Sequence, residues 1–334
     1  MQAGKLPLDL LTRLLGKIDV RDPRVFLGAK TGEDAALIDF GDRYLVAKTD
    51  PITFATDLIG WYLVQVNAND IAVMGGTPRW LMTTLLLPER TSESTVETIF
   101  EQLNNACETL GITLIGGHTE MTYDLPRPIA IGAMLGEVAK DRVVLTSGAQ
   151  PGDSIILTKG IAIEGCSILA HESAEELLER GLDQATIDRA SNFLYNPGIS
   201  VVKDASIACD TVDVHAMHDP TEGGLSGGLV EMAAGADVGL LIDQDTIPIL
   251  PECRQICDAL DLDPLGLIAS GSLLAAVPSG EVARLRGALA QEGISAYEIG
   301  KVTEPDDGLK IRDSDGVRDL PTFSRDELAR WFGE

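Results

Sequence analysis

The chain has 334 residues, of which 45% are hydrophobic and 23% are charged, and its formal net charge is −26. This length allows two ordinary domains, and this balance is typical of a folded protein rather than a disordered one. Such a negative charge excludes a nucleic-acid binder that relies on clustered lysine and arginine. No apolar run is long enough to span a membrane. The acidity itself has two open interpretations: solubility, or carboxylates that hold divalent cations.

The start of the chain and the cysteines indicate a cytoplasmic protein. Residues 1–15 contain an apolar patch that Asp9 and Arg13 interrupt, without the sections of a signal peptide. The five cysteines, at positions 107, 166, 209, 253 and 257, show no disulfide framework. Cys253 and Cys257 lie four residues apart, but no further ligand is near them in sequence, so buried thiols are favoured over a metal site.

In the first half of the chain, predicted strands alternate with predicted helices. In chain order the predicted elements are a hairpin of Ala35–Asp39 and Arg43–Lys48, a buried helix Leu58–Met74, a strand Leu81–Leu87, an amphipathic helix Glu93–Leu110, and strands Thr113–Ile115 and Ile129–Val138.

A turn-rich stretch, Ser147–Asp153, divides the sequence, and we expect domains at 1–148 and 149–334. The second half continues in the α/β style. Its predicted elements are a strand Ser154–Leu157, helices Ser173–Arg180 and Gln184–Leu194, a glycine-rich turn Thr221–Gly224, a helix Leu225–Ala234, a strand Gly239–Ile242, a helix Pro251–Leu260, a strand Ser272–Val277, a helix Gly280–Gln291, a hairpin around Asp313–Gly316, and a short helix opened by Ser324.

Acidic residues recur where the predicted elements of the first half begin or end. They lie in Gly32–Ala36, Lys48–Asp50, Asn67–Asp70 and Gly116–Glu120, and the chain has no Walker pattern. Singly, an aspartate in a turn is usually a cap or a solvated side chain. Together, converging carboxylates would repel one another and a triphosphate, and Mg²⁺ resolves that conflict. Phosphoryl transfer then needs little beyond positioning and neutralised charge.

Several segments, taken together and in this order, resemble one known family. They are Gly32–Ala36, Thr49–Asp50, Val66–Gly76, His218–Leu225 and Leu260–Leu265. Val66–Gly76 is similar to the family's V-N-x-x-D-[IL]-A-x-M-G-A helix. The family is the superfamily of aminoimidazole ribonucleotide synthetase (PurM), thiamine-monophosphate kinase, selenophosphate synthetase and the hydrogenase maturation factor HypE. The resemblance extends from Gly32 to about Val302.

The resemblance implies a two-domain PurM-like fold of the α/β (α+β) class and a homodimer that pairs through the strands of its first domain. It also implies ATP and Mg²⁺ as cofactors. Carried over position by position, it implies these roles: metal ligands Asp34, Asp50, Asp70 and Glu120; cofactor-binding residues Lys30, Gly32, Lys48, Thr49, Asn67, Gly116, Gly117 and Thr119; and catalytic residues His118 and Asp219. For Lys30 and Lys48, a solvated lysine remains the alternative.

Two features depart from the family pattern. His118 stands where relatives carry an acid, and imidazole is a poor Mg²⁺ ligand. Glu120 can replace that acid, His118 can contact a phosphate or act as an acid or base, or it can be a packed histidine. HypE carries a cysteine in its C-terminal tail, whereas the last cysteine here is Cys257. The nearest resemblance is therefore to HypE without its thiol tail.

We therefore predict an ATP- and Mg²⁺-dependent phosphotransferase or dehydratase that acts on a small molecule or an amide, including a protein amide. A non-catalytic ATP-binding maturation factor with a protein partner is the first alternative, and a kinase like thiamine-monophosphate kinase is the second. The enzyme is favoured because acids on the metal side persist mostly where phosphates are held.

Overall fold

The computed structural model describes all residues except 1–4, 54, 56 and 334. Its contacts divide the chain into two compact units. The smaller unit contains Val20–Gly28 and Asp34–Val143, and the larger unit contains the described residues up to Asp19, Ala29–Glu33 and the chain from Val144 onward. The single domain boundary at 148 stays a prediction. Among the described residues, no helix has the length and apolar character needed to cross a membrane.

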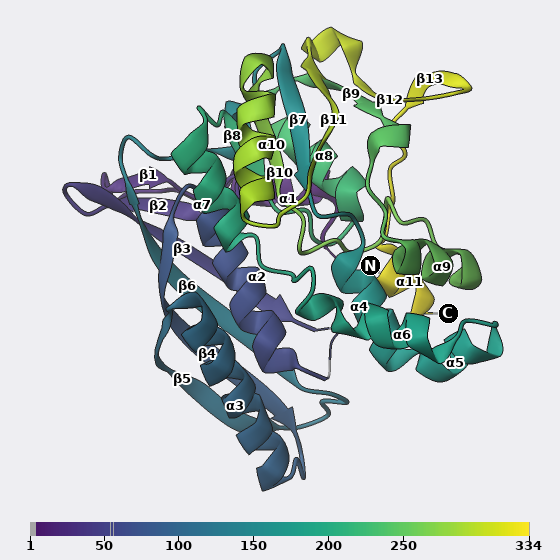
Figure 1. Cartoon of the computed structure of the whole chain (residues 1–334). Helices are drawn as coiled ribbons and strands as arrows, with labels where there is room; N and C mark the ends of the chain where they lie inside the picture. Colours follow the sequence, from purple (N-terminus) through teal and green to yellow (C-terminus); the bar gives the residue numbers. More distant parts are fainter. Residues whose placement is uncertain (1–4, 54, 56, 334) are drawn as a thin grey trace. The chain divides into compact units, whose positions relative to one another are not determined.

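The smaller unit is a six-stranded sheet with two helices on one face (Figure 1). The strand order is β1-β2-β3-β6-β4-β5, in which β4 and β5 run parallel and the other neighbours antiparallel. The elements are β1 (Val25–Leu27), β2 (Ala36–Asp39), β3 (Arg43–Ile52), α2 (Ile59–Val73), β4 (Thr77–Pro88), α3 (Glu93–Leu110), β5 (Thr113–Thr122) and β6 (Ile129–Ala139).

The two helices of this unit form for different reasons. Helix α3 is amphipathic: the Ser92 side chain accepts the Thr95 N–H at its start, and Gly111 ends it with a φ of 66°. Helix α2 is almost entirely buried and therefore apolar nearly all round. Its exceptions are polar residues, among them Asn67 and Asp70. A buried polar side chain needs hydrogen-bond or ion-pair partners. The buried polar residues of α2 are therefore the first structural sign of a site beneath this helix.

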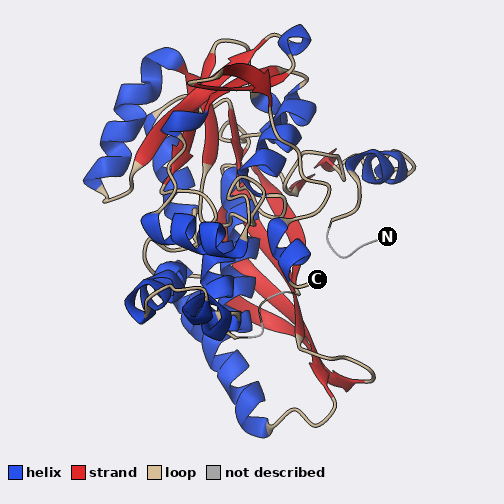
Figure 2. Cartoon of the chain, turned by 90° about the vertical axis from the view of Figure 1, so that its right-hand side faces the viewer, coloured by secondary structure: helices blue, strands red, loops and turns tan. Residues whose placement is uncertain are grey.

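The larger unit is a seven-stranded sheet with helices on both faces (Figure 2). The strand order is β13-β12-β9-β11-β7-β10-β8. Its strands are β7 (Asp153–Thr158), β8 (Ala216–His218), β9 (Gly239–Asp243), β10 (Leu274–Pro278), β11 (Ala296–Thr303), β12 (Leu309–Asp313) and β13 (Gly316–Asp319). Its helices are α1 (Leu8–Leu15), α4 (Ile163–Glu172), α5 (Ala174–Glu179), α6 (Gln184–Ser191), α7 (Val202–Thr211), α8 (Gly224–Ala236), α9 (Pro251–Leu260), α10 (Val282–Gln291) and α11 (Glu327–Trp331), with short 3-10 turns at Thr146–Gly148, Asn192–Leu194, Gln244–Thr246, Ser279–Glu281 and Pro305–Asp307.

The core of the larger unit lies between the sheet and α8. Leu229 and Met232 of α8 pack with Ile155 and Leu157 of β7 and with Leu274 of β10, all fully or almost fully buried. Because side chains alternate along β7, the intervening Ile156 faces the opposite side of the sheet and is also buried. Both faces of this sheet are therefore covered, which explains its continuous apolar strands.

The predicted α/β class is confirmed, and the predicted helices at Glu93–Leu110 and Pro251–Leu260 have the bounds observed. Several element predictions were wrong in their bounds. The strands predicted at Arg43–Lys48 and Leu81–Leu87 extend over Arg43–Ile52 and Thr77–Pro88. The strand predicted at Thr113–Ile115 continues to Thr122. The prediction was too short because this exposed edge strand carries glycine and polar residues instead of an alternation of apolar and polar residues. The last helix is capped by Asp326, whose side chain accepts the Leu328 N–H, and not by Ser324. Helices α1, α4 and α7 and strands β1, β8 and β11 were not predicted.

Gly117 of β5 allows the close approach of β4. A Cβ at Gly117 would lie 2.0 Å from the Thr83 carbonyl oxygen, whereas a Cβ at Gly116 would meet nothing within 4 Å. The two residues have nearly equal φ angles, 155° and 153°. We expect Gly117→Ala to lower the free energy of unfolding by roughly 3 kcal/mol and Gly116→Ala by about 1 kcal/mol. Urea unfolding measures both, and equal losses would contradict the steric argument.

Candidate functional site

The centre of the site is Lys48, which β3 directs toward α2. Its Nζ lies 3.0 Å from Asp70 Oδ1 and 3.7 Å from Asp50 Oδ2. Lys48 and Asp50 are two residues apart on β3 and therefore share a face of the sheet, while Asp70 comes from α2. Helix α2 packs on β3 and β6, so Asp70 is held over this face. The Asp70 side chain is only 5% exposed.

A third carboxylate acts on the same ammonium group. Asp34 lies just before β2, is buried, and interacts electrostatically with Lys48. Burial alone would lower the pKa of Lys48, but the three carboxylates outweigh burial and hold that pKa above its ordinary value. The structure thus brings together Asp34, Asp50 and Asp70, three predicted metal ligands from three separate segments, around one lysine.

Asn67 holds the backbone of β3 beside this cluster. Its Oδ1 accepts the Asp50 N–H at 3.0 Å, and its Nδ2 donates to the Asp50 carbonyl at 3.3 Å and the Leu63 carbonyl at 2.9 Å. Gly132 of β6 leaves room for this amide, because a Cβ there would lie 2.5 Å from Asn67 Nδ2. Thr49 also binds β6, since its hydroxyl donates to the Gly132 carbonyl at 2.7 Å.

The predicted residues of β5 lie at an exposed edge of the sheet. His118 and Glu120 project from the same face of the strand, with His118 Nε2 3.0 Å from Glu120 Oε2. The His118 side chain is 67% exposed, so it is not packed within the described part of the single chain. Gly116, Gly117 and Thr119 line a hollow of about 420 Å³ together with Thr83, Phe100, Leu114, Ile115 and His118.

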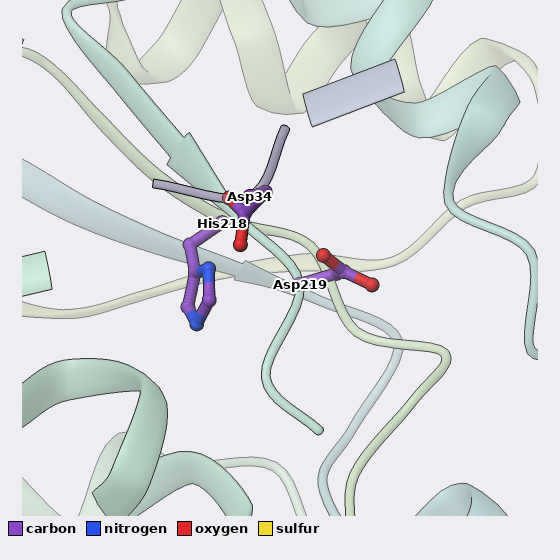
Figure 3. A group of neighbouring side chains, drawn as sticks. All are labelled: Asp34, His218 and Asp219. Atoms are coloured by element: carbon purple, nitrogen blue, oxygen red, sulfur yellow. The ribbon is translucent and has the colours of Figure 1, made fainter. Parts of the chain in front are cut away.

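Three predicted residues, Lys30, Gly32 and Asp219, belong to the larger unit. Gly32, with a φ of 85°, lies against α8, where a Cβ would be 2.9 Å from the Glu231 carbonyl oxygen. Lys30 Nζ lies 3.8 Å from Glu33. Asp219 is buried directly after β8, next to His218, and Figure 3 shows these two side chains pointing in different directions.

One cluster in the larger unit was missed by the sequence analysis. Glu231 of α8 joins His218, whose Nε2 lies 3.0 Å from Glu231 Oε2, to Lys5, whose Nζ lies 3.3 Å from Oε1. Lys5 also donates to the Thr221 hydroxyl at 3.1 Å. Burial alone would raise the pKa of Glu231, but Lys5 and His218 lower it to about 2. In the sequence, this cluster could have been suspected only from the position of His218 next to Asp219. Lys5 and Glu231 are 226 positions apart, so the sequence does not indicate that they form a pair.

Comparison with known proteins places these residues in a family. Residues 32–138 match the N-terminal domain, and residues 150–312 the C-terminal domain, of AIR synthase related protein. A Methanocaldococcus jannaschii protein named for hydrogenase expression or formation is 30% identical over 95% of this chain and 94% of its own length. The thiamine-monophosphate kinase of Pyrococcus horikoshii is 28% identical over 89% of this chain and 90% of its own.

A solved structure shares the fold. It is that of the hydrogenase maturation protein HypE in complex with ATP, with a TM-score of 0.74 and 22% identity over 95% of this chain and 96% of that one. The two-domain fold predicted from the sequence is confirmed by this match.

The charge balance at Lys48 gives a testable consequence. We expect Lys48→Met to lower the free energy of unfolding by roughly 3 kcal/mol at pH 8, because three carboxylates then face one another without a cation. Urea unfolding at pH 8 measures this.

The matched control is Lys140→Met. Lys140 pairs with Asp39 at 2.6 Å, but both side chains are 39% exposed. Exposed pairs contribute little, so we expect a much smaller change. Equal effects of the two substitutions would show that the Lys48 cluster is an ordinary surface ion pair.

Proposed function

The chain belongs to the AIR synthase related protein family, and from this premise we propose that it is an ATP- and Mg²⁺-dependent enzyme. The proposed reaction transfers a phosphoryl group to a small molecule or an amide. The similarity to a thiamine-monophosphate kinase and to the solved structure of HypE in complex with ATP supports the use of ATP. The cluster of Lys48 with its three aspartates is the observation that carries the proposal. We place the activity in the cytoplasm, where ATP is available.

The cluster fits a divalent cation by its donor chemistry. The carboxylates of Asp34, Asp50 and Asp70 supply the hard oxygen atoms that Mg²⁺ prefers, and they already converge on a positive charge. When bound, the ion would neutralise phosphate charge and orient the phosphate oxygens. We assign Lys48 to the phosphates, as a mobile positive point charge.

We assign Asn67 and Thr49 to positioning rather than to direct contact with the nucleotide. Both side chains are engaged with the backbone of β3 or β6. By fixing the backbone at Asp50, Asn67 fixes where that carboxylate points. A site held in this way needs little reorganisation when its ligands arrive, which lowers the free-energy barrier of the reaction.

On β5 we assign Glu120, rather than His118, to a metal at this edge of the sheet, because β6 and β4 lie between β5 and the Lys48 cluster. A carboxylate is the better Mg²⁺ ligand, and the hydrogen bond between the two side chains lets His118 orient Glu120 or donate to a phosphate. Gly116, Gly117 and Thr119 offer backbone that a ligand can approach closely. In the larger unit, Lys30 and Gly32 are assigned to ATP binding and Asp219 to catalysis.

A second candidate function is ATP binding without turnover, in a maturation factor that acts with a protein partner. His118, in a position where the family has an acid, favours it. The relative named for hydrogenase expression or formation also supports a maturation factor. A small-molecule kinase is a third candidate, supported by the similarity to a thiamine-monophosphate kinase. Its weakness is the segment Asp219–Gly224, which departs from the D-[VI]-S-D-G-L pattern expected of such kinases.

We also propose that the protein is a homodimer that pairs through β5. This strand is at the end of its sheet, and eight of its ten residues are exposed. Apolar side chains are among them, with Ile115 51% and Met121 48% exposed. An exposed edge with unpaired backbone groups and apolar side chains invites pairing with another strand.

The enzymatic proposal is tested at Asp70. We expect calorimetry to show ATP binding that requires Mg²⁺, and Asp70→Asn to weaken that binding by roughly tenfold or more. Asp39→Asn, which changes an exposed carboxylate of the same sheet, is the control and should bind as the wild type does. Binding with phosphate release supports the enzyme, and binding without it for every acceptor supports the second candidate. Absence of Mg²⁺-dependent binding would remove both.

The dimer is tested at Ile115. We expect sedimentation of the wild type at micromolar concentration to give a dimer, and Ile115→Asp to give a monomer, because a charge in a strand-pairing interface must be desolvated. Val317→Asp in β13 is the control, since Val317 is 60% exposed on an edge strand of the other sheet. A wild-type monomer, or dissociation by both substitutions, would contradict pairing through β5.

A further inference from the structure

A pocket of about 370 Å³ lies at the start of α8 in the larger unit. Three segments of this unit line it: residues 5–8, residues between 222 and 231, and residues 322–326 before α11. Apolar side chains, among them Leu6, Val230 and Phe323, form part of the lining. A pocket of this size, lined in this way, suits a small organic molecule with an apolar body.

Arg325 lines the pocket and has no partner in the described part of the chain. Its side chain is partly buried, its Nε is buried without a hydrogen-bond partner, and its guanidinium forms no ion pair there. The guanidinium lies against Gly333 instead of against a carboxylate. Of its three nitrogen atoms, Nε alone is buried, so a molecule in the pocket can reach the two Nη groups. A partly desolvated guanidinium without an acceptor is unfavourable, so an anion beside it would be stabilised.

The other cation of the lining, Lys5, already has partners. Its Nζ lies 3.3 Å from Glu231 Oε1 and donates to the Thr221 hydroxyl at 3.1 Å. Glu231 is also held by His218, whose Nε2 lies 3.0 Å from Glu231 Oε2. Lys5 and Glu231 therefore neutralise each other, and Arg325 remains the cation of the described lining that lacks an acceptor.

The remaining acids at the pocket, Glu222 and Asp326, are engaged as well. Asp326 Oδ2 accepts the Gly223 N–H at 2.6 Å, its Oδ1 accepts the Leu328 N–H at 2.8 Å, and Glu222 has an interaction of its own. Both acids act electrostatically on the buried Glu164 of α4, and we call these three residues the Glu164 cluster. Burial raises the pKa of Asp326 to about 6 and that of Glu164 to about 7. Near pH 6 the cluster therefore carries protons, which reduces its repulsion of an anion.

We propose that this pocket binds a small organic carboxylate with an apolar body. The two carboxylate oxygen atoms accept N–H groups of Arg325, and the apolar body contacts Val230 and Phe323. The planar guanidinium presents paired N–H donors, which match the geometry of a carboxylate. A single negative charge also balances the single cation without a partner, whereas a dianion would leave a surplus charge beside Glu222 and Asp326.

The probe is benzoate, with benzamide as its neutral analogue of nearly the same shape and inorganic phosphate as an anion without an apolar body. We expect calorimetry on the full chain at pH 6, without ATP or Mg²⁺, to give a benzoate Kd of about 1 mM or lower. Benzoate should bind at least about tenfold tighter than either comparison molecule. Equal affinities of benzoate and benzamide, phosphate binding as tight as benzoate, or no benzoate binding at millimolar concentration would overturn the proposal.

Two substitutions of Arg325 test its part. Arg325→Gln should weaken benzoate binding to the level of benzamide and leave benzamide binding unchanged, and Arg325→Lys, which keeps the charge without the paired donors, should have an intermediate effect. Arg284→Gln is the control, because Arg284 is 59% exposed and pairs with Glu281, and it should change neither affinity. Benzoate binding that survives Arg325→Gln in a variant shown to be folded by thermal unfolding would refute the assignment. If that variant does not fold, wild-type benzoate affinity in Arg325→Lys would refute it instead.

Val230→Thr tests the contact with the apolar body, since it exchanges a methyl group for a hydroxyl of similar size. We expect it to weaken benzoate and benzamide by a similar factor of about three, because both molecules have the same ring. Unchanged affinities for both would show that the ring does not contact Val230. No nucleotide is present in these experiments and Arg325 has no part in the proposed ATP chemistry, so the two proposals succeed or fail separately.

Discussion

The Lys48 ammonium is the interaction on which the smaller unit's site depends. Three carboxylates share this one group, so the cluster holds a net charge of two negative units, three minus one. Without Lys48 the carboxylates would repel one another at a place where Asp34 and Asp70 are buried. The lysine makes the arrangement stable before any ligand arrives, and the proposed divalent ion would neutralise the remaining charge.

The larger unit handles its buried carboxyl groups in two further ways. Glu231 is neutralised by two cations, Lys5 and His218, and its pKa is therefore lowered. Its stabilising effect is present above its ordinary pKa and is lost as the pH falls toward 2. Burial raises the pKa of Glu164 to about 7, so this carboxyl group retains a proton into the neutral range. In this chain, whose net charge is −26, individual buried carboxyl groups are thus stabilised locally: by a shared lysine, by ion pairs, or by a bound proton.

The sequence predicts site residues that lie in short recognisable segments, and it misses clusters that form between separate elements of the fold. Asp34, Asp50 and Asp70 each lie in a recognisable segment, so their grouping was predicted, and the structure places them around Lys48. The His218–Glu231 contact joins the end of β8 to α8, and the Glu164 cluster also joins separate elements, so no single segment indicates either contact. The length of β5 was missed because an exposed edge strand has no apolar alternation to detect.

The same charge balance constrains how the proposed ligands bind. A divalent ion alone must approach a site that already holds an ammonium group, and the two cations repel each other. A triphosphate alone must approach three carboxylates. Bound together, the proposed ion would be held by the carboxylates while the phosphates would draw Lys48 toward themselves, and both repulsions would be reduced. Because Asn67 fixes the backbone of β3 at Asp50, this exchange of partners requires movement of the Lys48 side chain and not of the strand. ATP and Mg²⁺ should therefore enter this site as a complex.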